Sequence, residues 1–382
     1  MSKKIIRSLI LIPLLLVICF TDGIGQSKQH GQKKNHTNFS AERKSAHEVD
    51  PLTIVEGKIL SWAVSSDDEI AYTPPGKWAN VYGKTYYRYV ERANGAAIKV
   101  NEVAASAANI LTPEQLEIIV SIVADQTTIE TKGLANRSLI ARELIKWREG
   151  DNGDENKILK LANENGILFK KLVLQSASAF GKVFQSLTIE QKSALSALRK
   201  SSDHASSSTR SLSVLDQSLS KEEHTVLRIL LCDFFIWATG TEEMNRYIDS
   251  GRPAVFFGFA NLRVKNRAGK NVSPGLRGEA SKVIEKLLDS NQKVLLDQLI
   301  ANQANLLDSY YNERGDLAGK LMAFQSANSV IDENEISDLC VSSEVVEAKL
   351  AIVEAKGMAF IIQSLTPDQM KVLQDFKANK NN

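Results

Sequence analysis

The chain has 382 residues, of which 43% are hydrophobic and 24% charged, a composition typical of a globular protein with two or three domains. Its formal net charge is +2 at pH 7. Removing the first 25 residues takes away three basic residues and one acidic residue, which leaves 44 of each sign. A neutral chain argues against general nucleic-acid binding, which needs a positive field.

The first 25 residues have the features of an export signal. A basic start (residues 3–7) precedes the apolar run Leu9–Phe20, which is too short to span a bilayer comfortably. We expect cleavage after Gly25 and a periplasmic or secreted protein, with an uncleaved anchor as the alternative. Cys19 suggests a lipoprotein, but Ile18 stands where lipoprotein processing requires a small side chain, so this interpretation is disfavoured.

The later chain contains no segment that we expect to cross a membrane. The most apolar candidate, Val226–Ala238, has only thirteen residues and carries Arg228 and Asp233. Cys232 and Cys340 are the cysteines left after cleavage. Export would permit a disulfide between them, and a buried free thiol is an equal expectation for Cys232.

Composition divides the remaining chain into four parts. Residues 26–75 form a polar leader, in which Asp50–Val64 is expected to be a short helix or strand packed against the body. Residues 76–200 are expected to be a run of helices, and residues 251–382 a second helical unit. Between them, residues 201–250 contain a Ser-rich linker and one apolar helix that is expected to bridge the two units.

A five-residue motif, Leu-Thr-x-x-Gln, recurs along the chain. It occurs as Leu111–Gln115, Leu187–Gln191 and Leu365–Gln369, and in altered form as Leu288–Gln292 and Leu219–Glu223. Its threonine is suited to cap a helix, and its glutamine, three residues later, is suited to reach back to the cap. Each copy alone predicts only a helix start, and the spacing of the copies carries more information.

The second half of the chain repeats the first at a nearly constant offset. The motifs that begin at Leu111 and Leu288 differ by 177 in numbering, and those at Leu187 and Leu365 differ by 178. Between them, Ile140–Trp147 aligns with Leu317–Phe324 at the same offset of 177. Ordered matches at one offset indicate an internal duplication. The sequence therefore predicts an all-α fold of two homologous helical units, 76–200 and 251–382.

Within each unit the second motif follows the first at a spacing of 76 or 77, and together with the export signal this pattern resembles the Spy/CpxP-like family of periplasmic proteins. The resemblance implies small all-helical cradles that act as ATP-independent chaperones or stress sensors and form antiparallel dimers, which the two units here would imitate as a monomeric pseudo-dimer. The motif residues expected to start helices are Leu111, Thr112, Gln115, Leu187, Thr188, Gln191, Leu288, Asp289, Gln292, Leu365, Thr366 and Gln369.

A holding chaperone needs an exposed surface that is both apolar and charged. Aromatic and basic residues gather before the first motif of each unit, and such residues are favoured in contact surfaces. The alternative is that the aromatic side chains belong to the core. The candidate client-binding residues are Trp78, Tyr82, Tyr86, Arg88, Arg92, Phe257, Phe259, Arg263 and Arg267.

Catalysis and cofactors are not expected. Ser218 and Lys221 match a bare Ser-x-x-Lys pattern without its partner motifs, and His204 and His224 are the only histidines of the folded region. The sequence also lacks a His/Cys cluster at metal-ligand spacing. We therefore expect a protein that binds unfolded or envelope proteins, with a non-catalytic envelope scaffold or a stress- or metal-sensing protein as alternatives.

Overall fold

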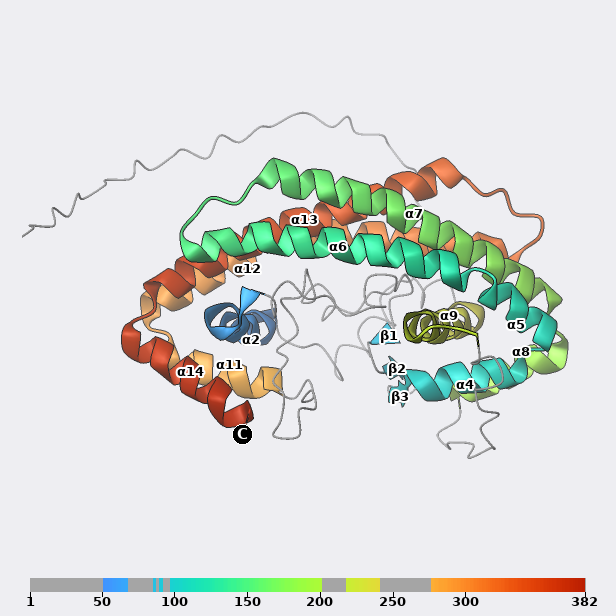
Figure 1. The fold of residues 1–382 in the computed structure, drawn as a ribbon, viewed down its shortest axis with the longest axis horizontal. Coiled ribbons are helices and arrows are strands. Elements are labelled where there is room, and N and C mark those ends of the chain that lie inside the picture. Colours follow the sequence, from blue (N-terminus) through green and yellow to red (C-terminus); the bar gives the residue numbers. More distant parts are fainter. Residues whose placement is uncertain are drawn as a thin grey trace, which may run out of the picture. The chain divides into compact units, whose positions relative to one another are not determined.

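The computed structural model describes residues 51–67, 85–86, 89–91, 97–200, 218–240 and 276–381, all within one compact unit, Ala46–Asn382. This part of the chain is mainly helical, as the sequence predicts (Figure 1). The helices are α2 (Pro51–Val64), α4 (Val100–Ile110), α5 (Pro113–Val120), α6 (Val123–Glu149), α7 (Glu155–Ser186), α8 (Ile189–Lys200), α9 (Lys221–Thr239), α11 (Leu276–Leu287), α12 (Ser290–Leu321), the short 3-10 helix η3 (Met322–Gln325), α13 (Glu333–Ser364) and α14 (Pro367–Asn381).

A small antiparallel sheet corrects the expectation that residues 76–200 are helical throughout. Its strands are β1 (Thr85–Tyr86), β2 (Tyr89–Glu91) and β3 (Ala97–Lys99), in the order β1-β2-β3. Tyr86 pairs with Tyr89, and Val90 with Ile98. The physical reason is local, since tyrosine, valine and isoleucine favour strands and no helix cap precedes them.

The segment before the first unit also differs from the expected polar leader. Helix α2 occupies residues 51–64, which agrees with the helical alternative for this stretch. Ile59, Leu60 and Trp62 are almost completely buried. Helix α2 packs mainly against α11, with further contacts to α12, α13 and α14. Residues 51–64 are therefore part of the core of the protein.

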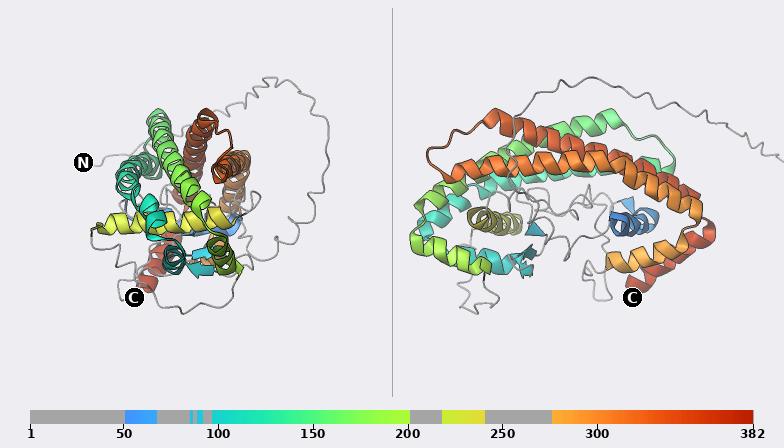
Figure 2. Two further views of the ribbon diagram at one scale, coloured as in Figure 1. Left: turned by 90° about the vertical axis from the view of Figure 1, so that its right-hand side faces the viewer. Right: turned by 180° about the vertical axis from the view of Figure 1, so that it is seen from behind.

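Four long helices lie side by side: α6, α7, α12 and α13 (Figures 1 and 2). Helices α12 and α13 pair with each other, α6 pairs with α7, and α13 contacts both α6 and α7. We call α4 to α8 the first helical group and α11 to α14 the second. Helices α7 and α13 therefore join the two groups.

In the described part of the chain, the buried side chains form two hydrophobic clusters. Each cluster surrounds a helix, α9 or α2, that belongs to neither helical group. One cluster surrounds α9 and draws on α4, α5 and α7, with Leu317, Leu321 and Cys340 from the second group. The other surrounds α2 and draws on α11, α13 and α14, with Ile140 and Leu144 of α6 from the first group. Each core therefore contains side chains from both groups.

Candidate functional site

Each copy of the motif begins a helix, and Thr112 shows how. The side chain of Thr112 accepts a hydrogen bond from the backbone N–H of Gln115 at 3.3 Å, and the backbone N–H of Thr112 donates to Gln115 Oε1 at 2.9 Å. This is a complete capping box with Pro113 in the first turn. It satisfies N–H groups that a helix start otherwise leaves unpaired.

The side-chain nitrogens of the motif glutamines join two motifs that are far apart in sequence. Gln115 Nε2 donates to Gln191 Oε1 at 3.2 Å, and Gln191 Nε2 donates to Gln115 Oε1 at 2.8 Å. Gln115 Nε2 also donates to the backbone oxygen of Ser186 at 3.1 Å, and Gln191 Nε2 to that of Ile110 at 2.8 Å. The start of α5 is thereby fixed to the end of α7, and the start of α8 to the end of α4.

The second helical group contains the same arrangement. Gln292 Nε2 donates to Gln369 Oε1 at 3.1 Å and to the backbone oxygen of Ser364 at 2.9 Å. Gln369 Nε2 donates to Gln292 Oε1 at 2.9 Å and to the backbone oxygen of Leu287 at 2.6 Å. We call each of these reciprocal glutamine pairs a clasp.

The helix caps of the other three motifs that form clasps have the same form as the cap at Thr112. Asp289 accepts from the backbone N–H of Gln292 at 2.9 Å, so its carboxylate replaces the threonine hydroxyl of the usual motif. Thr188 accepts from Gln191 N–H, and Thr366 from Gln369 N–H, each at 3.2 Å. The helix-start dipole and these N–H groups favour negative charge, and the pKa of Glu190 next to Thr188 is accordingly lowered by backbone and threonine hydrogen bonds.

The motif leucines anchor these helix starts in the cores. Leu111, Leu187 and Leu288 are less than a tenth exposed, and Leu365 is half-buried. Leu111 shares its cluster with Leu116, the residue at the fourth position of α5. The weak copy at 219–223 differs, because Glu223 accepts from the Ser220 N–H at 2.7 Å but its carboxylate has no N–H to donate to a second motif. It starts α9 and does not form a clasp.

A buried charge cluster lies between the two groups. Arg137 of α6 donates to Glu347 at 2.8 Å and contacts Glu344 at 3.4 Å, and both glutamates belong to α13. Burial and the neighbouring Glu344 carboxylate raise the pKa of Glu347 to about 7, although Arg137 opposes the shift. Arg314 stands 177 positions after Arg137, and its guanidinium lies over the ring of Phe169 at 4.5 Å.

Two reciprocal hydrogen bonds tie the ends of the long helices across the groups. Gln185 of α7 donates to the backbone oxygen of Phe324, and Gln363 of α13 donates to the backbone oxygen of Trp147, both at 3.2 Å. Gln185 and Gln363 differ by 178 in numbering, and Trp147 and Phe324 by 177, which are the offsets that separate the motifs of the two halves. The same hydrogen bond is therefore made twice, once from the first helical group to Phe324 and once from the second helical group to Trp147 of the first.

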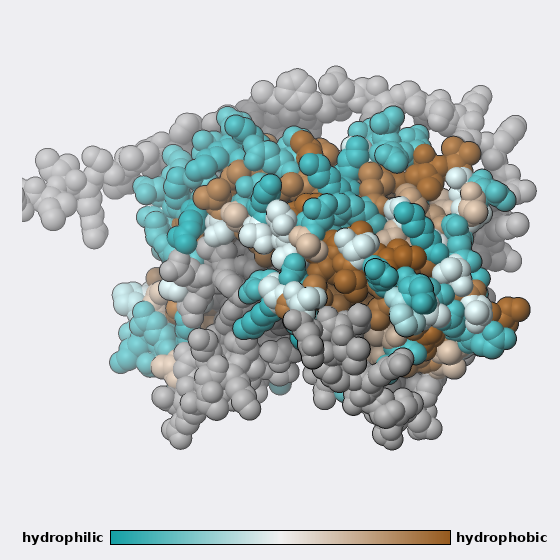
Figure 3. Space-filling view, turned by 45° about the vertical axis from the view of Figure 1, so that its right-hand side comes forward, coloured by the Kyte–Doolittle hydropathy of each residue, from teal (hydrophilic) through white to brown (hydrophobic). Residues whose placement is uncertain are grey.

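An open hollow of about 370 Å³ lies between α5 and α7 and reaches the start of α13. Its lining combines apolar side chains, such as Ile118, Ile122 and Leu174, with Lys182 and Glu333. Figure 3 shows one face of the molecule on which apolar and hydrophilic side chains alternate in patches. Strongly exposed apolar side chains include Ile189 and Phe360.

The candidate client-binding residues lie outside the described residues, with the exception of Tyr86. The backbone of Tyr86 belongs to β1. The export signal, the polar stretch 26–50 and the Ser-rich linker also lie outside the described part of the chain. These predictions remain expectations from sequence.

Other chemistry is sparse in the described ranges. Cys232 and Cys340 are both buried and neither is in a disulfide, and burial raises the pKa of both thiols, which makes them poor nucleophiles. No group of three or more His, Cys, Asp or Glu residues that could hold a metal ion occurs among the described residues. Within the same ranges no helix is long and apolar enough to cross a membrane.

The sequence interpretation missed two features. The Arg137–Glu347 pair joins residues 210 positions apart, and no local pattern signals it. The second feature had a signal: Trp62-Ala63 of α2 and Trp237-Ala238 of α9 match at an offset of 175. This short match is the sequence signal that relates α2 to α9.

Comparison of the chain with protein-family models, with curated proteins and with solved structures gives no match.

Proposed function

We propose that this protein is an exported, ATP-independent holder of partly unfolded proteins, built from two homologous helical units in one chain. The observation that carries the proposal is the clasp, which occurs twice with the same partners. Gln115–Gln191 and Gln292–Gln369 each join two helix starts that are distant in sequence. The clasps support a common origin of the two units.

The surface chemistry supports protein binding. Clients without a fixed sequence are held best by surfaces that offer apolar area beside charged groups. The hollow lined by Ile118, Ile122 and Leu174 has this character, because Lys182 and Glu333 lie at it. The predicted aromatic and basic segments before each first motif would add to this surface. We favour this function over an envelope scaffold for that reason, and no observation favours a stress- or metal-sensing role.

The test is suppression of aggregation by the purified chain from residue 26 onward. A chemically denatured client is diluted into buffer without nucleotide, and light scattering is followed with increasing amounts of protein. We expect scattering to fall in proportion to the protein added. An unchanged signal with several unrelated clients would reject the holder function in favour of a scaffold or a dedicated partner.

Two charge-reversal variants on α7 test whether clients bind at the hollow. Lys182 and Lys171 are both exposed, but only Lys182 lines the hollow. We expect Lys182→Glu to weaken suppression for acidic clients and Lys171→Glu to leave it unchanged. Equal effects of the two substitutions would show that the hollow is not the contact surface.

A further inference from the structure

If each repeat begins with the helix that precedes its helical group, the first repeat begins with α2 and the second with α9. Each of these two helices packs mainly on the helical group of the other repeat. Helix α2 precedes the first group in sequence, yet it packs mainly on α11, α12, α13 and α14 of the second, with a further hydrogen bond from Arg148 of α6 to the backbone oxygen of Trp62 at 3.3 Å. Helix α9 precedes the second group, yet it contacts α4, α5, α6, α7 and α8 of the first. Figure 1 shows α2 beside α11 and α9 beside α4.

Equivalent hydrogen bonds hold the carboxyl ends of the two helices. Lys377 of α14 donates to the backbone oxygen of Val64 at 3.0 Å. Arg199 of α8, the counterpart of Lys377 in the repeat, donates to the backbone oxygen of Ile236 at 3.3 Å and to Thr239 Oγ1 at 2.8 Å. Each group therefore uses one basic side chain of its last helix to bind the exposed carbonyl end of the incoming helix.

We propose that each helical group forms a groove that binds an amphipathic helix donated by the other repeat of the same chain, and that buried polar pairs determine which helix enters which groove. The proposal rests on the duplication described above. It adds an interaction surface, its partner, and the residues that set its specificity.

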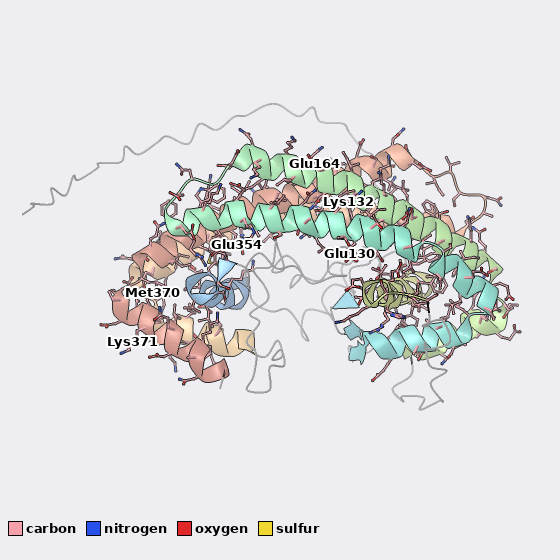
Figure 4. All side chains as sticks on the ribbon, viewed as in Figure 1. Glu130, Lys132, Glu164, Glu354, Met370 and Lys371 are labelled. Atoms are coloured by element: carbon pink, nitrogen blue, oxygen red, sulfur yellow. The ribbon has the colours of Figure 1, made fainter. Side chains whose placement is uncertain are left out.

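The second groove is polar where it meets α2. Lys58 forms an ion pair with Glu354, and Ser281 donates a hydrogen bond to Glu56. All four residues are less than a tenth exposed. Gln303 Nε2 also donates to Glu354 Oε2 at 3.1 Å, and Glu354 lies on the side of α13 toward α2 (Figure 4). A buried ion pair of this kind contributes mainly to the choice of partner, because the desolvation of both charges offsets much of its attraction.

The first groove has different residues at the equivalent positions. Leu231 stands where α2 has Glu56, and Ala104 where α11 has Ser281. Ser176 stands where α13 has Glu354, and it accepts a hydrogen bond from Gln126 Nε2 at 2.8 Å. At these equivalent positions the first groove is therefore uncharged and more apolar than the second.

Binding of α9 in the second groove, or of α2 in the first, would be energetically unfavourable. In the second groove, α9 would bring Asp233 to Glu354, and two buried carboxylates repel each other. In the first groove, α2 would bring Glu56 to the methyl group of Ala104, which offers no hydrogen bond to a buried carboxylate. Attraction at the correct groove and repulsion at the wrong one together specify the exchange.

A disulfide test establishes which groove holds α2. In a chain with Cys232→Ala and Cys340→Ala, we introduce Glu56→Cys with Ser281→Cys and compare it with Glu56→Cys and Ala104→Cys. We expect the first pair to oxidise within one chain, at monomer mass, and the second to remain reduced. Oxidation of the 56–104 pair, or disulfide-linked dimers from the 56–281 pair, would overturn the proposal. No client is involved, so this result is independent of the holder function.

Two further variants test the specificity residues in the 56–281 cysteine background. Lys58→Asp places in α2 the aspartate that α9 carries at the equivalent position, Asp233. We expect this variant to have a lower thermal midpoint and a lower cross-link yield. Adding Glu354→Ser places in the second groove the serine that the first groove carries at the equivalent position, Ser176. We expect the double variant to recover most of the lost thermal midpoint and most of the lost cross-link yield. Lys282→Asp, an exposed site on α11, is the control and should change neither. An unaffected Lys58→Asp variant, or no recovery in the double variant, would contradict the assigned specificity.

Discussion

Gln115 and Gln191 each donate a hydrogen bond to the side-chain oxygen of the other, at 3.2 and 2.8 Å, although they belong to separate motifs. Each side chain also accepts a hydrogen bond from its own N-cap N–H and donates one to the backbone oxygen of the residue just before the partner motif. A glutamine is needed at both positions because only an amide offers an acceptor and two donors on one short side chain. This explains why the motif occurs in pairs.

Truncation of the clasp is expected to be costly and non-additive. Gln115 is buried and Gln191 half-buried. We expect Gln115→Ala to lower the free energy of unfolding by about 1–3 kcal/mol, because buried partners lose their hydrogen bonds, and Gln191→Ala to cost less. In urea unfolding, the double variant should cost less than the sum of the two by about 0.5 kcal/mol or more. Strict additivity would show that the two amides do not act together.

Loss of a threonine cap is expected to have a smaller and uniform cost. Thr112→Ala and Thr366→Ala each remove one side-chain cap, and we expect each to cost about 1 kcal/mol. Thr128→Ala is the matched control, since Thr128 is exposed inside α6 and its hydroxyl bonds only to the preceding turn, at Ala124. Thermal midpoints that stay at the parent value in both cap variants would refute a stabilising role for the caps.

The helix starts were predictable because capping is a local property. Thr112, Pro113 and Gln115 carry the full signal within four residues, and Asp289 retains it with a different side chain. The clasps themselves were not predicted. Equal spacing of the motifs indicates that they are related, but the contact between Gln115 and Gln191 depends on how the helices fold back.

The sheet and the packing partners of α2 were missed for different reasons. Short strands such as Tyr89–Glu91 have no long periodic pattern, so an aromatic and basic segment is easily taken for a helix. Residues 51–64 were expected to be a short helix or strand packed against the body, and they form a helix. The helices that cover it were not predicted, because the sequence shows which residues are apolar but not what lies against them. Ile59 and Trp62 are buried only because α11 and its neighbours lie against them.

The close approach of α7 and α13 predicts that Gly166 tolerates no side chain. A Cβ at Gly166 would lie 2.5 Å from the Cα of Val341, so the two helices would have to move apart. We expect Gly166→Ala to destabilise the protein by about 1–3 kcal/mol despite the higher helix propensity of alanine. At Gly357 the nearest atom is the end of the flexible Leu299 side chain, at 2.7 Å, and Gly357→Ala should cost clearly less. Equal costs in chemical denaturation would show that backbone proximity is not the determinant.

The buried Arg137–Glu347 pair predicts a dependence of stability on pH. Burial and the Glu344 carboxylate raise the pKa of Glu347 from 4.5 to about 7 in the folded protein. The folded state therefore binds a proton that the unfolded state has released between these two values. The contribution of Glu347 to stability is fully present below its unfolded pKa and is lost as the pH rises through about 7.

Glu347→Gln isolates this contribution, because glutamine keeps an oxygen for Arg137 but does not ionise. We expect the stability of the variant relative to the parent to be higher at pH 8 than at pH 5, as measured by urea unfolding at both pH values. Glu335→Gln, at an exposed position of α13 paired with Lys320, is the control and should show no such difference. If the parent and the Glu347→Gln variant differ by the same amount at both pH values, Glu347 does not change its protonation on unfolding in this range. The positive charge of Arg137 would then be sufficient to keep Glu347 ionised in the interface between α6 and α13.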